Sequence, residues 1–149
     1  MNDKDVKILL HLRKNSRKPV AEISKEIGVP EATIHSRISG YERNSLIKKY
    51  TCLLDLKKLG YLVKTTIAIK LDKSQRQGFM DFILENDNIN SASKINGGYD
   101  FIIETVFRDM LELHNFLEGM NEKFSINEKH VFHMIEDIKN EEFLGGKLK

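Results

Sequence analysis

Residues 19–41 read PVAEISKEIGVPEATIHSRISGY, two short amphipathic segments separated by Gly28. Pro19 and Pro30 each stand at the start of a segment, where proline suits the first turn of a helix. Gly28 can take the left-handed conformation that reverses the chain after the first segment. The apolar residues recur at helical spacings: Val20, Ile23, Ile27, Ile34, Ile38 and Tyr41. Two short helices joined by a glycine-containing turn predict a helix-turn-helix.

Another helix precedes this pair and completes the predicted N-terminal unit. In DKDVKILLHLRKN (residues 3–15), Asn2 or Asp3 is available as the N-cap. The apolar residues that recur near helical spacing are Val6, Leu9, Leu10 and Leu12. The third helix is expected to end near Asn44 in a left-handed cap. A short helical bundle with no nucleic-acid role is the alternative that spacing alone leaves open.

Charge is unevenly distributed along the chain. The 149 residues carry 24 Lys and Arg against 22 Asp and Glu, a net charge of +2. Residues 1–50 hold eleven basic and six acidic residues, which gives +5, whereas residues 51–149 hold thirteen and sixteen, which gives −3. The positive field that attracts a polyanion is therefore concentrated on the predicted helix-turn-helix. We expect double-stranded DNA as the partner.

The remainder of the chain alternates strand and helix patterns. The predicted elements are a strand over residues 62–71, a helix opened by Ser74 and Gln77, a strand over 89–95, a strand over 99–107, a helix opened by Asp109 and Glu112, and a strand over 126–138. The glycines of residues 96–98 predict a hairpin between the second and third strands. The order βαββαβ is typical of a ferredoxin-like fold, an antiparallel sheet with both helices on one face.

The predicted fold class is therefore α+β, in four parts. Residues 1–46 form a winged-helix-like helix-turn-helix domain, 47–61 a linker, 62–140 a ferredoxin-like domain, and 141–149 a C-terminal tail. No apolar run approaches the roughly 20 residues that span a bilayer, and the charged start is unlike a signal peptide. Cys52 is the only cysteine, so no intrachain disulfide can form. We expect a cytoplasmic protein with no membrane partner.

Short motifs along the chain carry a family resemblance. They lie at residues 5–9, 21–23, 27–29, 33–34, 37–38, 47, 50, 59–61 and 98–100. Together they resemble the Lrp/AsnC (feast/famine) family of bacterial and archaeal transcription regulators over nearly the whole length. The resemblance implies a regulator that binds palindromic operators as a homodimer, often extended to tetramers or octamers. Pro30 and Gly40 depart from the family pattern, which has Ser and commonly a basic residue at these positions.

The predicted DNA contacts lie on the third helix and on basic residues around it. With Ile34 and Ile38 facing the core, the opposite side of this helix faces the DNA groove. The candidates for base edges are Ala32, Thr33, His35, Ser36, Ser39 and Arg43. The candidates for phosphates are Arg17, Lys18, Arg37, Arg43, Lys48 and Lys49. We expect about half of these six to touch DNA.

Dimerisation and effector binding are assigned to the second domain. A two-fold dimer doubles the DNA contacts, and the sheet face without helices can bury itself against a second copy. The resemblance implies that an amino acid binds near the hairpin turn, whose residues are Asn96, Gly97, Gly98, Tyr99 and Asp100. The glycine amides suit an α-carboxylate and Asp100 suits an α-ammonium. The alternative is that these residues only build the turn.

No cofactor, metal site or catalytic residue is predicted, and we do not expect an enzyme. His130 and His133 are an odd number apart, so they point to opposite faces of a strand. An architectural protein that coats DNA with little sequence preference remains an alternative. An enzyme like the related sirohaem decarboxylases is a second one. Their histidine- and arginine-rich, Tyr- and Trp-containing central hairpin stretch contrasts with INGGYDFIIETVF here, and the chain has no tryptophan.

Overall fold

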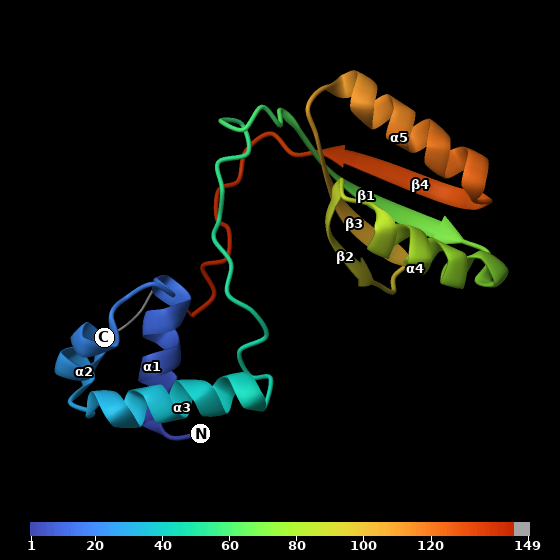
Figure 1. The fold of residues 1–149 in the computed structure, drawn as a ribbon. Helices are drawn as coiled ribbons and strands as arrows, with labels where there is room; N and C mark the ends of the chain where they lie inside the picture. Colours follow the sequence, from blue (N-terminus) through green and yellow to red (C-terminus); the bar gives the residue numbers. More distant parts are fainter. Residues whose placement is uncertain (145–149) are drawn as a thin grey trace. The chain divides into compact units, whose positions relative to one another are not determined.

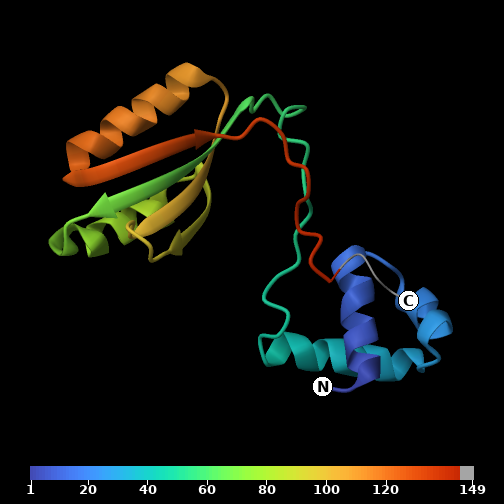
Figure 2. The same ribbon diagram turned by 180° about the vertical axis from the view of Figure 1, so that it is seen from behind.

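The computed structural model describes residues 1–144. They form two compact units (Figures 1 and 2). The head unit comprises Met1–Leu53 with the described residues from Ile138 onward, and the sheet unit comprises Leu54–Asp137. The last part of the predicted tail, residues 145–149, lies outside the described residues. Within residues 1–144, every helix is too short or too polar to cross a bilayer.

The head unit contains the three predicted helices: α1 (Asp3–Lys14), α2 (Val20–Ile27) and α3 (Glu31–Arg43). Gly28 adopts the left-handed conformation, with φ 65°, and its amide closes α2 by donating to the Ser24 carbonyl at 2.9 Å. A residue with a Cβ is strained there, which explains the glycine. The buried core joins all three helices and the turn: Ile8, Ile23, Val29, Ile34 and Tyr41. The helix-turn-helix prediction is confirmed.

The local predictions for the head unit hold in part. Ile8 and His11 are the buried residues of α1, and Leu9 and Leu12 pack against the core, whereas Val6 is 37% exposed. Consecutive apolar residues at 8–10 fit more than one helical face, and packing against α2 and α3 selected the face with Ile8. Ser45, with φ 60°, takes the left-handed conformation instead of Asn44. Residues 45–62, all of them described, contain no strand, so no β-wing follows α3.

The sheet unit has the predicted βαββαβ order. Its elements are β1 (Val63–Leu71), the short 3₁₀ helix η1 (Lys73–Gln75), α4 (Arg76–Glu85), β2 (Ile89–Lys94), β3 (Phe101–Phe107), α5 (Met110–Lys123) and β4 (Ile126–His133). The strands lie in the order β2-β3-β1-β4, and every neighbouring pair is antiparallel. Both helices cover the same face of this sheet (Figure 2). The ferredoxin-like prediction is confirmed.

Alternation along the two central strands determines which face is covered. Ile67, Ile69 and Leu71 of β1 face the helices, as do Phe101 and Ile103 of β3. Phe79 of α4 and Met120 of α5 complete this buried cluster. The buried hydroxyls of Thr65 and Thr105 lie opposite each other and share a hydrogen bond of 2.6 Å. Each hydroxyl is the hydrogen-bond partner of the other, which offsets the cost of burying two polar groups.

The predicted last strand was too long, and one predicted helix cap is not formed. β4 ends at His133, which pairs with Thr65 near the start of β1, and the Met134 amide then donates to the Lys64 carbonyl at 2.9 Å, where β1 itself begins. Ile135 and Ile138 are 90% and 95% exposed. The Ser74–Gln77 capping box is absent among the described contacts because η1 occupies residues 73–75 and α4 begins only at Arg76. Asp109 caps α5 as predicted.

Candidate nucleic-acid interface and effector site

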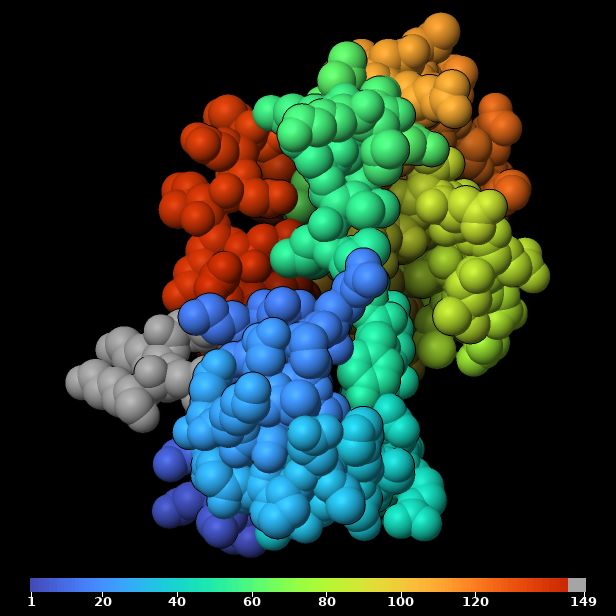
Figure 3. Space-filling model, turned by 60° about the vertical axis from the view of Figure 1, so that its left-hand side comes forward, coloured from blue at the N-terminus to red at the C-terminus, as the bar shows by residue number. Residues whose placement is uncertain are grey.

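One side of α3 is exposed along its whole length. Ile34 and Tyr41 are buried in the head core. The exposed residues of α3 include the six predicted for base contacts, Ala32, Thr33, His35, Ser36, Ser39 and Arg43, together with the acidic residues Glu31 and Glu42. In the space-filling view, α2 and the beginning of α3 form one continuous convex surface (Figure 3). A convex helix surface with small and polar side chains fits the major groove, because the helix axis can approach the base edges closely.

Four of the predicted phosphate contacts are exposed basic residues: Arg17, Arg43, Lys48 and Lys49. The chain that carries the two lysines is fixed beside the end of α3. The amide of Ile47 donates to the Tyr41 carbonyl at 3.1 Å, and the Tyr50 hydroxyl donates to Glu42 at 2.8 Å. Burial and this acceptor raise the pKa of Tyr50. The two lysines are therefore held close to the exposed helix.

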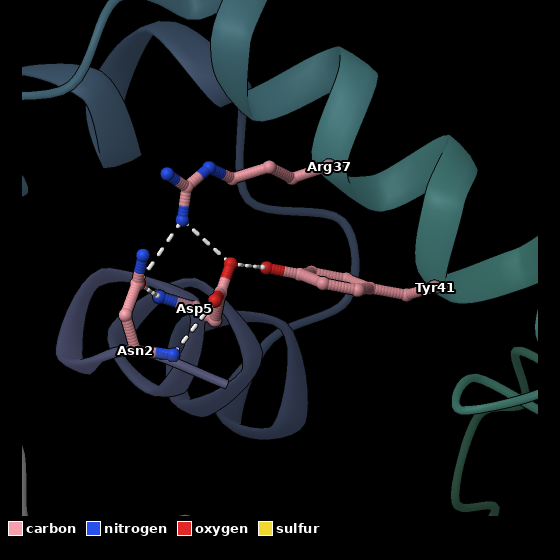
Figure 4. Close-up of polar contacts among 4 residues, drawn as sticks. All are labelled: Asn2, Asp5, Arg37 and Tyr41. Carbon is pink, nitrogen blue, oxygen red and sulfur yellow. Dashed lines mark hydrogen bonds and ion pairs between the residues drawn. The ribbon is translucent and has the colours of Figure 1, made fainter.

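Arg37 and Lys18, the other two phosphate candidates, are partly buried and bonded within the head unit. Arg37 Nη1 donates to Asp5 Oδ1 at 2.5 Å and to Asn2 Oδ1 at 3.1 Å (Figure 4). Lys18 Nζ donates to Glu26 at 2.6 Å, and its side chain is only 18% exposed. These partners are separated by 8 to 35 residues in the sequence, so no local pattern indicated them.

Asp5 is the centre of the larger polar network. Its Oδ1 also accepts from the Tyr41 hydroxyl at 2.6 Å, and its Oδ2 accepts from the Asn2 amide at 2.9 Å. The hydrogen bond from Tyr41, the Asn2 amide and the Arg37 guanidinium together lower the pKa of Asp5 to about 2. Burial and the Asp5 carboxylate raise the pKa of Tyr41 to about 12. Asp5 is therefore ionised and Tyr41 is a neutral donor near pH 7.

A second polar network, not predicted from the sequence, joins α1 to α2. His11 is 4% exposed, with Nδ1 at 3.2 Å from Lys18 Nζ and Nε2 at 3.5 Å from Glu26 Oε2. A lysine ammonium only donates, so Nδ1 accepts and the imidazole proton is assigned to Nε2. Burial, and then the Lys18 charge, lower the pKa of His11. The imidazole is therefore neutral in the folded head unit near pH 7.

The predicted effector residues form the turn between β2 and β3. Gly97 and Gly98 have φ angles of 91° and 103°, a conformation that disfavours any side chain. Both glycines are exposed, and neither amide donates a hydrogen bond within residues 1–144. Asp100 is already paired: Oδ2 accepts from the Leu71 amide at 2.8 Å and Oδ1 from Arg76 Nη2 at 2.6 Å. The Asp100 carboxylate thus fixes the turn against the start of α4.

A groove of the sheet unit lies next to the strand ends that flank this turn, without including the turn. It has a volume of about 540 Å³ and is lined by α4 and β2, with Met80, Ile83 and Ile89 supplying its apolar surface. None of residues 96–100 lines it. The predicted effector residues and this groove are therefore separate features of the surface.

The sheet face opposite the helices carries partly exposed apolar side chains. Ile102 and Val106 of β3 lie on this face, between the residues that β3 buries. Phe132 of β4 is 49% exposed, and its ring stacks on that of His130 with centroids 4.3 Å apart. His133 pairs with Thr65 and so points to the helix side, as its spacing predicted. No group of three metal-ligating side chains is assembled within residues 1–144.

An exposed recognition helix in a three-helix head, joined to a ferredoxin-like unit, defines a two-domain class of DNA-binding regulators. Two family models match the two parts: the AsnC-type helix-turn-helix domain over residues 1–42, and the Lrp/AsnC ligand binding domain over residues 64–142. The chain belongs to the Lrp/AsnC family of transcriptional regulators. It is a DNA-binding transcription regulator with a ligand-binding domain.

A relative in sequence agrees with this assignment, and two solved structures share the fold. The HTH-type transcriptional regulator FL11 of Pyrococcus furiosus is 31% identical over 118 residues, which cover 79% of this chain and 78% of FL11. The Neisseria meningitidis transcriptional regulator NMB0573, solved in complex with L-Met, superposes with a TM-score of 0.88 at 19% identity over 94% of this chain and 93% of that one. Escherichia coli AsnC superposes with a TM-score of 0.83 at 23% identity, over 94% and 95% of the two chains.

Proposed function

We propose that the chain is a homodimeric, sequence-specific regulator that reads DNA with the exposed side of α3. The observation that carries this proposal is the division of α3 into a buried side and an exposed side. Ile34 and Tyr41 anchor the helix, and the opposite side offers hydroxyl, imidazole and small side chains to base edges. Arg17, Lys48 and Lys49 supply contacts to phosphates, which hold the register of the protein on the duplex.

The dimer uses the sheet face that carries Ile102, Val106 and Phe132. One head makes too few contacts for tight specific binding, whereas two heads read half-sites about one helical turn, or a multiple, apart. Burying two such faces against each other removes exposed apolar surface from water. Tetramers and octamers are further assemblies of the same dimer.

An amino acid is the proposed effector, bound at the turn of residues 96–100. The NMB0573 structure holds L-Met. In this turn the Gly97 and Gly98 amides donate no hydrogen bond within residues 1–144, so both N–H groups are available to an α-carboxylate. Asp100 has both oxygens engaged, yet a carboxylate has about four lone-pair sites, so an α-ammonium can still bind it. Effector binding then changes DNA affinity if it favours one assembly state over another.

The test is selection of bound sites from random DNA by wild type and by Ser36→Ala, with Ser74→Ala as the control. Ser36 is exposed on α3, and Ser74 is exposed on η1 of the sheet unit. We expect Ser36→Ala to change preference at particular base pairs, with each lost contact worth about 1–3 kcal/mol of discrimination. Ser74→Ala should select the wild-type sites. Identical sites from all three proteins would remove Ser36 from the base-reading surface.

A further inference from the structure

The start of α1 and two successive turns of α3 meet at one carboxylate. Asp5 Oδ1 accepts from Arg37 and Tyr41, which are four residues apart and therefore neighbours on one side of α3. Asp5 also completes the N-terminal cap of α1: its Oδ2 accepts from the Asn2 amide, while the Asp5 amide donates to Asn2 Oδ1 at 2.9 Å. The same side chain thus caps the start of α1 and fixes the rotation of α3 about its axis.

The Arg37 guanidinium is held by only one of its edges. Both of its hydrogen bonds within residues 1–144 leave from Nη1, and its side chain remains 27% exposed (Figure 4). The guanidinium is planar, with five N–H donors in a rigid fork. Fixing Nη1 therefore also fixes the direction of Nη2 and Nε, whose donors suit a phosphate oxygen.

We propose that Asp5 is a positioning residue for DNA recognition: it seats α3 through Tyr41 and orients Arg37 toward a DNA phosphate. This inference rests on the proposed reading of DNA by α3. The expected change in DNA affinity is opposite to the one that charge predicts, because Asp5 is an acidic group in a segment of net charge +5 that binds a polyanion. On charge alone, removing Asp5 strengthens binding to every DNA. A positioning role requires the opposite result for specific DNA.

Asp3 provides a matched control for the effect of removing one negative charge. It lies in the same turn of α1, it is exposed, and it makes no side-chain hydrogen bond or ion pair within residues 1–144. Asp3→Asn and Asp5→Asn therefore change the net charge of the head unit equally, and only Asp5→Asn acts on α3. The measurement is the affinity of the full chain for its selected operator and for unrelated DNA of the same length at one salt concentration.

We expect Asp3→Asn to bind both DNAs as tightly as wild type or more tightly. Asp5→Asn should lose about tenfold in affinity for the operator, the scale of one charge-assisted hydrogen bond, and should lose less for unrelated DNA, which needs the phosphate contact of Arg37 but not the seating of α3 on base edges. Equal behaviour of the two variants would overturn the role of Asp5. A wild type that binds operator and unrelated DNA equally would instead overturn the proposed function, and this inference with it.

Two further variants keep the inference testable if Asp5→Asn fails to fold. Tyr41→Phe keeps the buried ring and removes only the hydroxyl that donates to Asp5. It should lower the ratio of operator to unrelated affinity, and an unchanged ratio contradicts the seating of α3. Arg37→Ala should reduce the slope of log K against log salt by about one, as expected for one lost phosphate contact. An unchanged slope would contradict the orientation of Arg37 toward a phosphate.

Discussion

The two units differ in what their buried interiors contain. The sheet unit is built around aromatic packing, with Phe79 in contact with Phe82, Phe101 and Phe124 at ring-centroid distances of 5.2–5.7 Å. The head unit has a smaller apolar core, and its helices are also joined by the polar networks of Asp5 and His11. Apolar burial is insensitive to pH, whereas hydrogen-bonded ion pairs are not. The sheet unit also has ion pairs, such as Arg76 with Asp100, but the buried histidine and the carboxyl group whose pKa is lowered to about 2 both lie in the head unit. We therefore expect the head unit to respond to pH more strongly than the sheet unit.

The largest expected effect is the loss of stability of the sheet unit in Phe79→Ala. Phe79 is fully buried among aromatic rings, so truncation should lower the free energy of unfolding of the sheet unit by about 3–5 kcal/mol. Urea denaturation followed by circular dichroism measures this loss. Leu84→Ala, on the same helix but 82% exposed, is the control and should cost little. Similar losses in both variants would show that the aromatic cluster does not hold the sheet unit together.

Effector binding tests the role given to the sheet unit. Calorimetry with each of the twenty amino acids should find one that binds, and Asp100→Asn should weaken it about tenfold by disturbing the turn and its charge. Asp87→Asn, an exposed carboxylate outside the turn, is the control. If an amino acid binds Asp100→Asn as tightly as wild type, its site lies elsewhere. If none binds at millimolar concentration, the protein acts without an amino-acid effector.

The pH dependence of the head unit follows from His11. Its folded-state pKa is lowered from 6.5, mainly by burial, so below about pH 6.5 the unfolded chain binds the proton more readily than the folded one. The head unit should therefore lose stability as the pH falls through 6.5 toward the lowered pKa. His11→Gln should flatten this part of the melting curve against pH, whereas His35→Gln, at an exposed position, should not. A wild-type melting temperature independent of pH between 7.5 and 5.5 contradicts the assignment.

The smallest expected effect is on the salt dependence of DNA binding, which distinguishes an exposed basic residue from one that is paired within the head unit. Lys49→Ala should reduce the slope of log K against log salt by about one for any DNA sequence, because one phosphate contact is lost. Lys18→Ala should mainly destabilise the head unit, because Lys18 is paired with Glu26 and adjoins His11. Equal salt slopes for wild type and Lys49→Ala would remove this lysine from the phosphate contacts.

The fold was predictable because its signals are local. Helical spacing around Gly28, and strand patterns interrupted by Gly97 and Gly98, specify elements whose order defines both units. What the sequence did not reveal depends on contacts between distant residues. Arg37 was predicted as a phosphate contact from its charge, but its bond to Asp5 spans 32 residues. His11 carries no apolar signal, so its burial follows only from the packing of α1 on α2.

A footprinting titration tests the central claim most directly, namely that α3 reads sequence while the sheet unit assembles the dimer. Genomic fragments bound by purified protein are cleaved over a range of protein concentrations. We predict protection of a few defined sites, each with two half-sites related by a two-fold axis and spaced by about one helical turn or a multiple. Protection that spreads evenly along every fragment as protein is added would contradict the claim and identify an architectural DNA-coating protein.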